Sequence, residues 1–465
     1  MEQTSFTPIT TDLRRRINRA LGDDCEIADP QALADYDHDA SELRHAPEMV
    51  VRVHNREQVQ ELLRLANQYN FPVTPRSGGT GLAGGCLSTC GGVVLDLSGM
   101  NRILAIDTRN LVAEVQPGVI TQQLREAARE AGLFYPPDPA SLDESTVGGN
   151  AATNAGGPAC VKYGTTKDYV LGLEVVLPNG ECIRTGVKTR KGVVGYDMTH
   201  LIVGSEGTLG IITALTLKLI PHPPAVTGVV AVFKDLETAM DAVAQVMTRG
   251  HLPSAIEFLD YKCLALVGDR LPFNVPGGTS SLLIIETDGV AGNITDEIDA
   301  IGRICREVGA VHLHPATAPD ERERIWEARR QVSLRIHDHA ALYVSEDVAV
   351  PLGCIAELVA RLPEYEQKYH LEIFAFGHAG DGNIHLNITA ADRDHPERVE
   401  EAIRALLQLV LDMGGTISGE HGIGAAKKRF LPMELPAESI RLQRGIKMLF
   451  DPNQVLNPGK LFPNT

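Results

Sequence analysis

The chain has 465 residues, which is too long for one hydrophobic core and suggests two or three domains. Its formal net charge of −17 disfavours nucleic acid or an anionic membrane surface as a partner. The eight cysteines form no CxxC pair, which argues against an iron–sulfur cluster in this chain. The N-terminus lacks a signal peptide's apolar segment, and no apolar run could span a membrane. We expect a cytoplasmic protein, or one peripheral to the inner membrane through a partner.

The first part of the chain predicts a small βαβ unit after a helix over 11–21. Residues 49–53 alternate as a short strand, and Asn55 is suited to cap a helix that continues to about residue 70. A second strand follows over 71–74.

Three glycine-rich loops follow predicted strands, at 75–85, 136–157 and 203–212. In the first, PRSGGTGLAGG, five glycines allow several backbone N–H groups to converge on an anion. Its spacing matches neither the P-loop nor GxGxxG. A flexible linker is the alternative, and the strand signals on both sides disfavour it. Together the loops suit one long ligand with a pyrophosphate in the middle.

The pattern of predicted strands and helices changes after a proline cluster, and we place a domain boundary near residue 224. Strands and helices over 226–314 follow the order βαββαβ, which is ferredoxin-like. A second, similar series of strands and helices over 342–413 enlarges the same antiparallel sheet, and we expect the helices on one face of it. We therefore expect domains at 1–224 and 225–415, and a final segment, 416–465, that packs back on the first domain.

The stretch FGHAGDGNIHLN, 376–387, predicts a β-hairpin with Asp381-Gly382 as a two-residue turn. This turn would place His378 directly opposite His385, with Cβ atoms about 5 Å apart. The second motif, SGEHGIG at 418–424, adds Glu420 as a carboxylate and His421 as another imidazole. Two histidines and one glutamate with an open position are typical of a catalytic metal site. The alternative is a pair of cross-strand histidines with an exposed Glu-His.

The three loops, the ferredoxin-like half and the motifs HxGDGNxH and GEHGIG resemble the flavin-dependent D-2-hydroxyacid dehydrogenases. That family includes glycolate oxidase large subunits, D-lactate dehydrogenases and D-2-hydroxyglutarate dehydrogenase, and the likeness covers about 49–462. It implies an α+β fold with a two-subdomain FAD-binding domain of the vanillyl-alcohol-oxidase type and a ferredoxin-like antiparallel substrate domain. It also implies oxidation of a D-2-hydroxyacid to the 2-oxoacid, with a hydride passing to flavin.

By this resemblance, residues of all three loops and of the C-terminal tail would bind FAD. Thr80 stands where relatives with covalent flavin often carry histidine, so we expect non-covalent FAD. The first loop would hold the pyrophosphate through Arg76, Ser77, Gly78, Gly79, Thr80, Gly81 and Leu82. The ribityl chain and ring would meet Pro137, Asp138, Thr146, Gly149, Asn150, Asn154 and Gly157. The adenosine side would meet Glu206, Thr208 and Ile212, and Asn457 would touch the flavin.

The resemblance also implies a divalent metal held by His378, His385 and Glu420, most simply zinc, with manganese or iron as alternatives. His421 would be the base, since imidazole is suited to proton transfer at neutral pH. Asn387 would bond the substrate. The same family places a carboxylate clamp at Arg329, whose alternative is an exposed helix arginine.

The segment YVSEDVAVP, 343–351, lacks the basic residue that relatives commonly carry before the acidic pair. We therefore favour a small monocarboxylate, D-lactate or glycolate, over D-2-hydroxyglutarate. The sequence leaves the electron acceptor open among a quinone, an electron-transfer flavoprotein, an iron–sulfur subunit and a cytochrome. A homodimer is compatible with it. Two other functions are a redox-neutral flavoenzyme on this scaffold and a flavin-bearing subunit without catalysis. The first should lack the HxGDGNxH and GEHG motifs and the second should have lost the metal ligands, so the presence of both in this sequence disfavours them.

Overall fold

The computed structural model describes residues 6–22, 24–391 and 396–463, and the chain divides into two compact units. The chain passes between the units four times. The first unit takes in the described part of Met1–Ala155, Thr165–His222 and His421–Thr465, and the second takes in Gly156–Gly164 and Pro223–Glu420. No helix among the described residues is long and apolar enough to cross a membrane.

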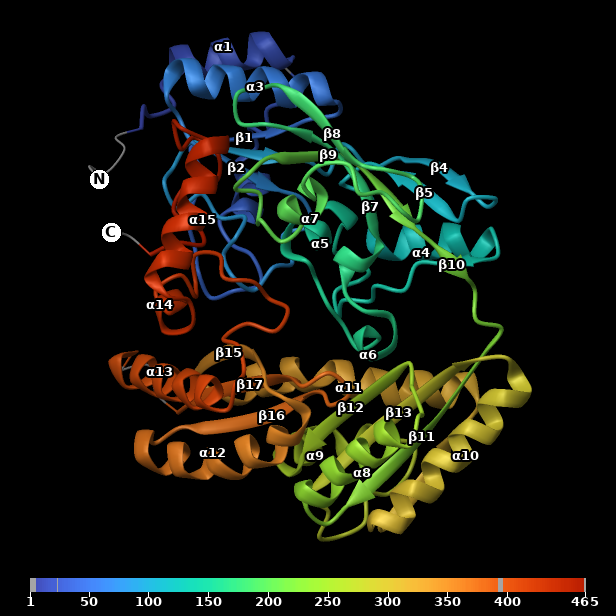
Figure 1. The fold of residues 1–465 in the computed structure, drawn as a ribbon. Coiled ribbons are helices and arrows are strands. Elements are labelled where there is room, and N and C mark those ends of the chain that lie inside the picture. The colour runs from blue at the N-terminus through green and yellow to red at the C-terminus, as the bar shows by residue number, and fades with distance from the viewer. Residues whose placement is uncertain (1–5, 23, 392–395, 464–465) are drawn as a thin grey trace. The chain divides into compact units, whose positions relative to one another are not determined.

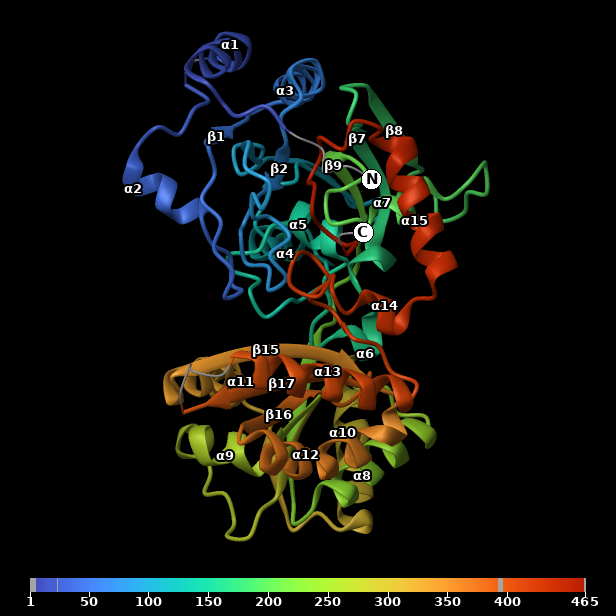
Figure 2. The same ribbon diagram turned by 90° about the vertical axis from the view of Figure 1, so that its left-hand side faces the viewer.

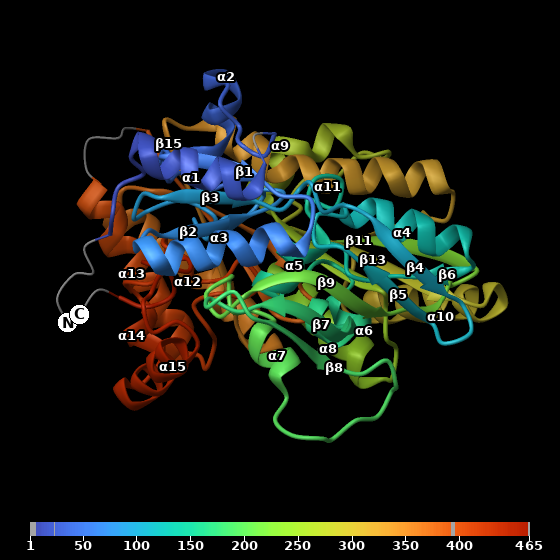
Figure 3. The same ribbon diagram turned by 90° about the horizontal axis from the view of Figure 1, so that it is seen from above.

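The first unit contains the predicted βαβ unit. Its strands form a parallel sheet in the order β1-β3-β2, with bounds Met49–Arg52, Val93–Asp96 and Val73–Arg76. Helices α1 (Thr11–Leu21) and α3 (Arg56–Tyr69) lie side by side over it (Figures 1 and 3). Asn55 accepts the Gln58 N–H as predicted, and Asn70 ends α3 in the left-handed conformation. The apolar faces of both helices and the sheet share one core.

A second, antiparallel sheet completes the first unit in the order β4-β5-β9-β7-β8. Its strands are Ile103–Asp107, Val112–Val115, Ile211–Lys218, Val170–Val176 and Cys182–Gly186, and a small pair joins β6 (Leu133–Phe134) to β10 (Ile220–Pro221). The helices are α2 (Pro30–Leu33), α4 (Thr121–Glu130), α5 (Val147–Thr153), α7 (Met198–Ile202), α14 (Leu431–Glu434) and α15 (Ala437–Phe450). The sequence patterns did not predict the β7–β8 hairpin or the last two helices.

The second unit is built on one antiparallel sheet in the order β14-β11-β13-β12-β16-β17-β15. The first four strands have the predicted ferredoxin-like arrangement, with bounds Ala225–Phe233 (β11), Ala255–Asp260 (β12), Ser281–Gly289 (β13) and His312–Ala316 (β14). The second series adds Leu342–Ala349 (β15), Glu372–His378 (β16) and Asn383–Ala390 (β17), and β12 pairs with β16 to make the sheet continuous.

Helices cover both faces of this sheet, so the prediction that they lie on one face is wrong. One face carries α8 (Leu236–Thr248), α10 (Ala291–Val308), α12 (Ile355–Tyr369) and α13 (Pro396–Asp412). Figure 2 shows α9 (Tyr261–Val267) and α11 (Pro319–His339) on the other side. The strands are apolar on both sides, which is why each face takes a layer of helices. The short α6 (Cys160–Tyr163) also belongs to this unit.

The β16–β17 hairpin differs in register from the prediction. His378 pairs with Asn383 and Phe376 pairs with His385, so residues 379–382 form the connection and the two-residue turn is wrong. The Gly380 N–H donates to the Ile256 carbonyl of β12, a long-range bond that favours the wider loop. Because the register differs by two residues, His378 and His385 still lie on the same face.

Gly382 should be intolerant of any side chain. It lies at φ 85°, and a Cβ there would meet the Val350 carbonyl oxygen at 2.1 Å. Gly382→Ala should destabilise the protein by about 2–5 kcal/mol, the sum of left-handed strain and overpacking. Gly250, at φ 89° with open space around it, is the control, and Gly250→Ala should cost only about 1–2 kcal/mol. Equal losses of stability in urea titrations would contradict this packing.

Candidate functional site

Two buried imidazoles and one carboxylate converge on the sheet of the second unit. The rings of His378, at the end of β16, and His385, on β17, lie 5.2 Å apart at 87°. The Glu420 Oε1 atom is 3.4 Å from His378 Nε2 and 3.7 Å from His385 Nε2. The three side chains predicted from the two motifs are thus brought together around one oxygen atom.

Two fully buried carboxylates lie behind these imidazoles, and the sequence analysis proposed neither. Glu257, on β12, contacts His378 Nδ1 through one oxygen and accepts a 2.7 Å hydrogen bond from Arg329 Nε with the other. Asp347, on β15, lies 3.7 Å from His385 Nδ1 and accepts the Glu420 N–H at 2.7 Å. A charged residue within an apolar strand, as in AIEFLD, is the signal that could have identified Glu257.

Burial and charge act in opposite directions on this cluster. Burial alone would lower the pKa of His378, but the attraction of Glu257 and Glu420 holds it well above its usual value. Burial alone would raise the pKa of Glu257, but His378 and Arg329 hold it below its usual value. Glu257 is therefore ionised, and the His378 environment favours a positive charge at this position.

The donor atoms are close enough together to hold a metal ion. Asp347, His385 and Glu420 each offer an atom within 4.8 Å of the others. His378 does not belong to that group, yet its Nε2 faces the same Glu420 oxygen. We favour His378 over Asp347 as the ligand, because the Asp347 oxygens already accept from the Glu420 N–H and from Asn383 Nδ2 at 2.6 Å.

The residues expected to bind or deprotonate the substrate differ in their contacts and burial. Arg329 is held by Glu257, and its guanidinium lies over the Phe376 ring at 4.6 Å, so it is not an exposed helix arginine. Asn387 shares the face of His385 and accepts from Ser345 Oγ at 3.1 Å. Its buried amide nitrogen has no hydrogen-bond partner among the described residues. His421 directly follows Glu420 and is the first residue of its segment in the first unit.

The first glycine-rich loop leaves β2 in the first unit. Arg76 is engaged within that unit, where it donates to the carbonyls of Asp35 and His38 and lies 5.3 Å from the Tyr36 ring. Its side chain therefore fixes the loop's base, and backbone groups are left to bind an anion. The following residues, Ser77, Gly78, Gly79, Thr80, Gly81 and Leu82, are half-buried or exposed.

The second and third loops are held by their own hydrogen bonds. Thr146 caps α5 by accepting the Gly149 N–H, and Asn150 donates to Thr121. Asn154 ends α5 in the left-handed conformation. In the same loop Pro137 is buried and Asp138 is half-buried, while Gly157 belongs to the second unit. In the third loop Thr208 donates to the Ser205 carbonyl, Ile212 is buried in β9, and both Glu206 oxygens accept backbone N–H groups.

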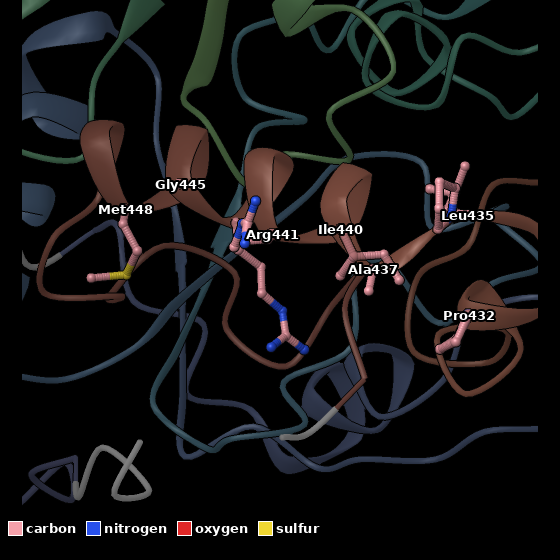
Figure 4. Close-up of a pocket in the computed structure, with 9 residues that line it drawn as sticks. Pro432, Leu435, Ala437, Ile440, Arg441, Gly445 and Met448 are labelled. Atoms are coloured by element: carbon pink, nitrogen blue, oxygen red, sulfur yellow. The ribbon is translucent and has the colours of Figure 1, made fainter.

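Residues of α14 and α15 and of the turn between them line a groove of about 670 Å³ (Figure 4). Pro432, Leu435, Ala437, Ile440 and Met448 give it an apolar lining, with Arg441 and Arg444 beside them. It contains none of the predicted site residues and no acidic or imidazole side chain. It is not a candidate for the chemistry of the two motifs.

Comparison with known proteins identifies the family of the chain. Residues 222–461 match the family model of the C-terminal domain of FAD linked oxidases, and residues 47–186 match an FAD binding domain. The chain is 40% identical over 430 residues to the glycolate oxidase subunit GlcD of Bacillus subtilis, covering 92% of each chain. It is 37% identical to a D-lactate dehydrogenase of Anaerostipes hadrus, again covering 92% of each.

The structure also resembles p-cresol methylhydroxylase, with a TM-score of 0.81, 19% identity and 98% of each chain covered. At that identity the likeness shows the fold, an FAD-binding domain of the vanillyl-alcohol-oxidase type joined to an antiparallel sheet domain. The matched models and the identities then define the family more narrowly. The chain belongs to the FAD-linked oxidases, and the expected family and fold class are confirmed.

Two buried polar atoms in the first unit suit a bound FAD. Ser77 Oγ and Asn457 Oδ1 are buried without a hydrogen-bond partner among the described residues. Asn457 is nonetheless well fixed, since its amide donates to the carbonyls of Gly85 and Glu206. Buried polar atoms normally find partners, so both atoms, which come from residues predicted to bind FAD, fit groups that the cofactor would supply.

Ser77→Ala should weaken FAD binding by about 2- to 10-fold, the effect of losing one hydrogen bond. The apoprotein should keep its stability, because the hydroxyl has no protein partner to lose. Ser88 is the matched control, since its buried hydroxyl donates to the His45 carbonyl. Ser88→Ala should lower stability and leave FAD affinity unchanged in a fluorescence titration of apoprotein with FAD. Unchanged affinity in Ser77→Ala would remove Ser77 from the cofactor site.

Proposed function

We propose that the protein oxidises D-lactate or glycolate to the corresponding 2-oxoacid, using non-covalent FAD and a divalent metal ion, and passes the electrons to an acceptor other than NAD. The observation that carries the proposal is the convergence of His378, His385 and Glu420 in the substrate domain of an FAD-linked oxidase. The names of similar proteins, glycolate oxidase subunit and D-lactate dehydrogenase, support the substrate class.

The charge balance around the imidazoles supports a cation. Three carboxylates contact them (Glu257, Asp347 and Glu420), and one guanidinium, Arg329, pairs with Glu257. Three negative charges and one positive charge leave a formal charge of −2 when both histidines are neutral. A divalent ion would balance it. Two imidazoles and a carboxylate suit zinc, and manganese or iron are also compatible.

The carboxylates behind the histidines support the same conclusion. A histidine that binds a metal through one nitrogen usually donates from the other to a carboxylate or carbonyl, which fixes its tautomer and ring orientation. Glu257 contacts His378 Nδ1, and Asp347 lies beside His385 Nδ1. The Nε2 atoms of both histidines therefore face Glu420. The metal, when bound, would lower the pKa of the substrate's hydroxyl group.

The other residues of the site would orient the substrate and move its proton. Arg329 would bind the carboxylate of the hydroxyacid, since Nε is held by Glu257 and the terminal nitrogens can form a fork. The Asn387 amide, without a partner in the described residues, would donate to the substrate. His421 would accept the hydroxyl proton, while the hydride of the same carbon passes to the flavin.

The FAD would be bound by the three glycine-rich loops and Asn457. Backbone N–H groups of residues 77–82 would hold the pyrophosphate, which is consistent with the internal bonds of Arg76. Thr80 offers no nucleophilic imidazole for a covalent link. None of the eight cysteines forms a disulfide, which supports work in the reducing cytoplasm.

A second candidate is a flavin-bearing subunit of a larger electron-transfer complex. The word subunit in the name of one similar protein favours it. The two candidates differ in one respect, whether this chain alone reduces its flavin with substrate. A quinone, an electron-transfer flavoprotein or an iron–sulfur subunit would serve as the acceptor in either case, and this chain could also form a homodimer.

Anaerobic D-lactate or glycolate should bleach the flavin of the purified holoenzyme without NAD. Glu420→Ala and His378→Ala should lose the metal and slow bleaching by about 100-fold or more, since a Lewis-acidic ion contributes several kcal/mol. His314→Ala, a histidine at the opposite sheet edge bonded to Glu321, should retain both. Full activity in Glu420→Ala and His378→Ala, or after chelation, would rule out the metal's role. If no 2-hydroxyacid bleaches the flavin of the parent holoenzyme, the second candidate is favoured.

Glu257→Gln should weaken zinc binding by about 10- to 100-fold, the usual effect of losing a carboxylate that supports a histidine ligand. The amide keeps the shape of Glu257 but cannot accept from both His378 and Arg329. The affinity is measured by competition with a chelating dye, without substrate. Asp260→Asn, the loss of another buried carboxylate on the same strand, should leave zinc affinity unchanged. Equal affinities in Glu257→Gln and the parent protein would contradict the proposed support.

A further inference from the structure

Glu206 is a buried acid whose two oxygens both accept backbone hydrogen bonds from the GEHGIG motif. The Ile423 N–H donates to Oε1 and the Gly424 N–H donates to Oε2, each at 2.7 Å. All three residues lie in the first unit. The resemblance implied contact with the adenosine side of FAD, but this bidentate arrangement occupies the carboxylate within the protein.

The backbone of Glu206 is fixed as firmly as its side chain. Its N–H donates to the Ala152 carbonyl of α5, and its carbonyl accepts the Asn457 amide at 2.8 Å. It has φ 52°, a conformation that costs energy in a residue other than glycine and persists only where the surroundings enforce it. Burial raises the pKa of this carboxyl, while the two N–H groups and Lys460 favour its charged form. Glu206 is thus kept buried and in a strained backbone conformation, and its carboxylate binds the backbone of residues 423 and 424.

The loop that Glu206 holds begins at the proposed base. Glu420 is fixed in the second unit, where its N–H donates to Asp347. Three and four residues further on, Ile423 and Gly424 are fixed in the first unit by Glu206. His421 and Gly422 are the only residues between these two attachments. A histidine bounded in this way has little backbone freedom, because Glu420 before it and Ile423 after Gly422 are both bonded to buried acids.

We infer that Glu206 is the positioning residue for His421, and that it holds the backbone after His421 so that the imidazole is aligned to accept the substrate's proton. The inference rests on the proposed function of His421. It gives Glu206 no contact with substrate or flavin. A carboxylate is needed because both partners are N–H donors, and an amide at this position would oppose one of them with its own NH₂ group.

Glu206→Gln and Gly422→Ala test the inference from both sides of the contact. Gly422 lies at φ 82°, and a Cβ there would meet Glu206 Oε1 at 2.8 Å, so the alanine displaces the carboxylate without changing it. In both variants kcat for flavin reduction by D-lactate should fall about 10- to 100-fold, as expected for a misplaced catalytic group. KM, FAD content and zinc content should not change. The solvent deuterium isotope effect should rise, because proton transfer becomes slower.

Asp260→Asn is the control for a loss of stability alone. Asp260 is a buried acid that also accepts two backbone N–H groups, from Cys263 and Ala375. This variant should unfold at lower urea concentration but keep kcat and the isotope effect of the parent. A second readout is independent of activity: amide hydrogen exchange over 421–425 should accelerate in Glu206→Gln and not in Asp260→Asn.

The outcomes separate this inference from the proposed function. If His421→Ala blocks flavin reduction while Glu206→Gln and Gly422→Ala keep the parent kcat and isotope effect, the positioning role is overturned and the proposed function stands. Loss of FAD from Glu206→Gln would also overturn it and return Glu206 to the cofactor site. If His421→Ala reduces its flavin at the parent rate, the proposed base is wrong and the inference fails with it.

Discussion

The site depends on buried negative charge gathered around two imidazoles. Glu257 and Asp347 are completely buried, and each stands beside the Nδ1 atom of one histidine. Such charges are costly unless they are paired. Arg329 balances Glu257, but Asp347 and Glu420 leave an excess that a divalent cation would neutralise. This one electrostatic requirement explains why the histidines, the arginine and the GEHGIG glutamate are held together.

Buried acids also fix the backbone on either side of His421. Asp347 fixes Glu420 in the second unit, and Glu206 fixes residues 423 and 424 in the first. A buried acid on each side therefore holds the short segment that carries His421. Hydrogen bonds from backbone N–H groups to ionised acids are among the stronger ones, and the proposed role of His421 requires such support, since small displacements of a catalytic group lower the rate strongly.

Much of the fold and the convergence of His378, His385 and Glu420 could be predicted because both rest on local patterns. Helix α3 has its cap at Asn55, and the ferredoxin-like order follows from alternating strand and helix signals. The predicted register of the β16–β17 hairpin differs from the observed one by two residues. A two-residue shift leaves each side chain on the same face of the sheet, so His378 and His385 still come together. The sequence marks Glu257 as unusual, but the partners of Glu257 and Glu206 could not be predicted, because His378 and Gly424 lie 121 and 218 residues away.

X-ray diffraction from crystals of the zinc-loaded protein, recorded on both sides of the zinc absorption edge, tests the electrostatic explanation most directly. An anomalous peak should lie about 2.0–2.2 Å from His378 Nε2, His385 Nε2 and a Glu420 oxygen, the usual bond lengths for zinc with these ligands. Glu257 and Asp347 should remain on the far side of the imidazoles. A site without a peak, or a peak bound by Asp347 in place of His378, would contradict the proposed balance of charge.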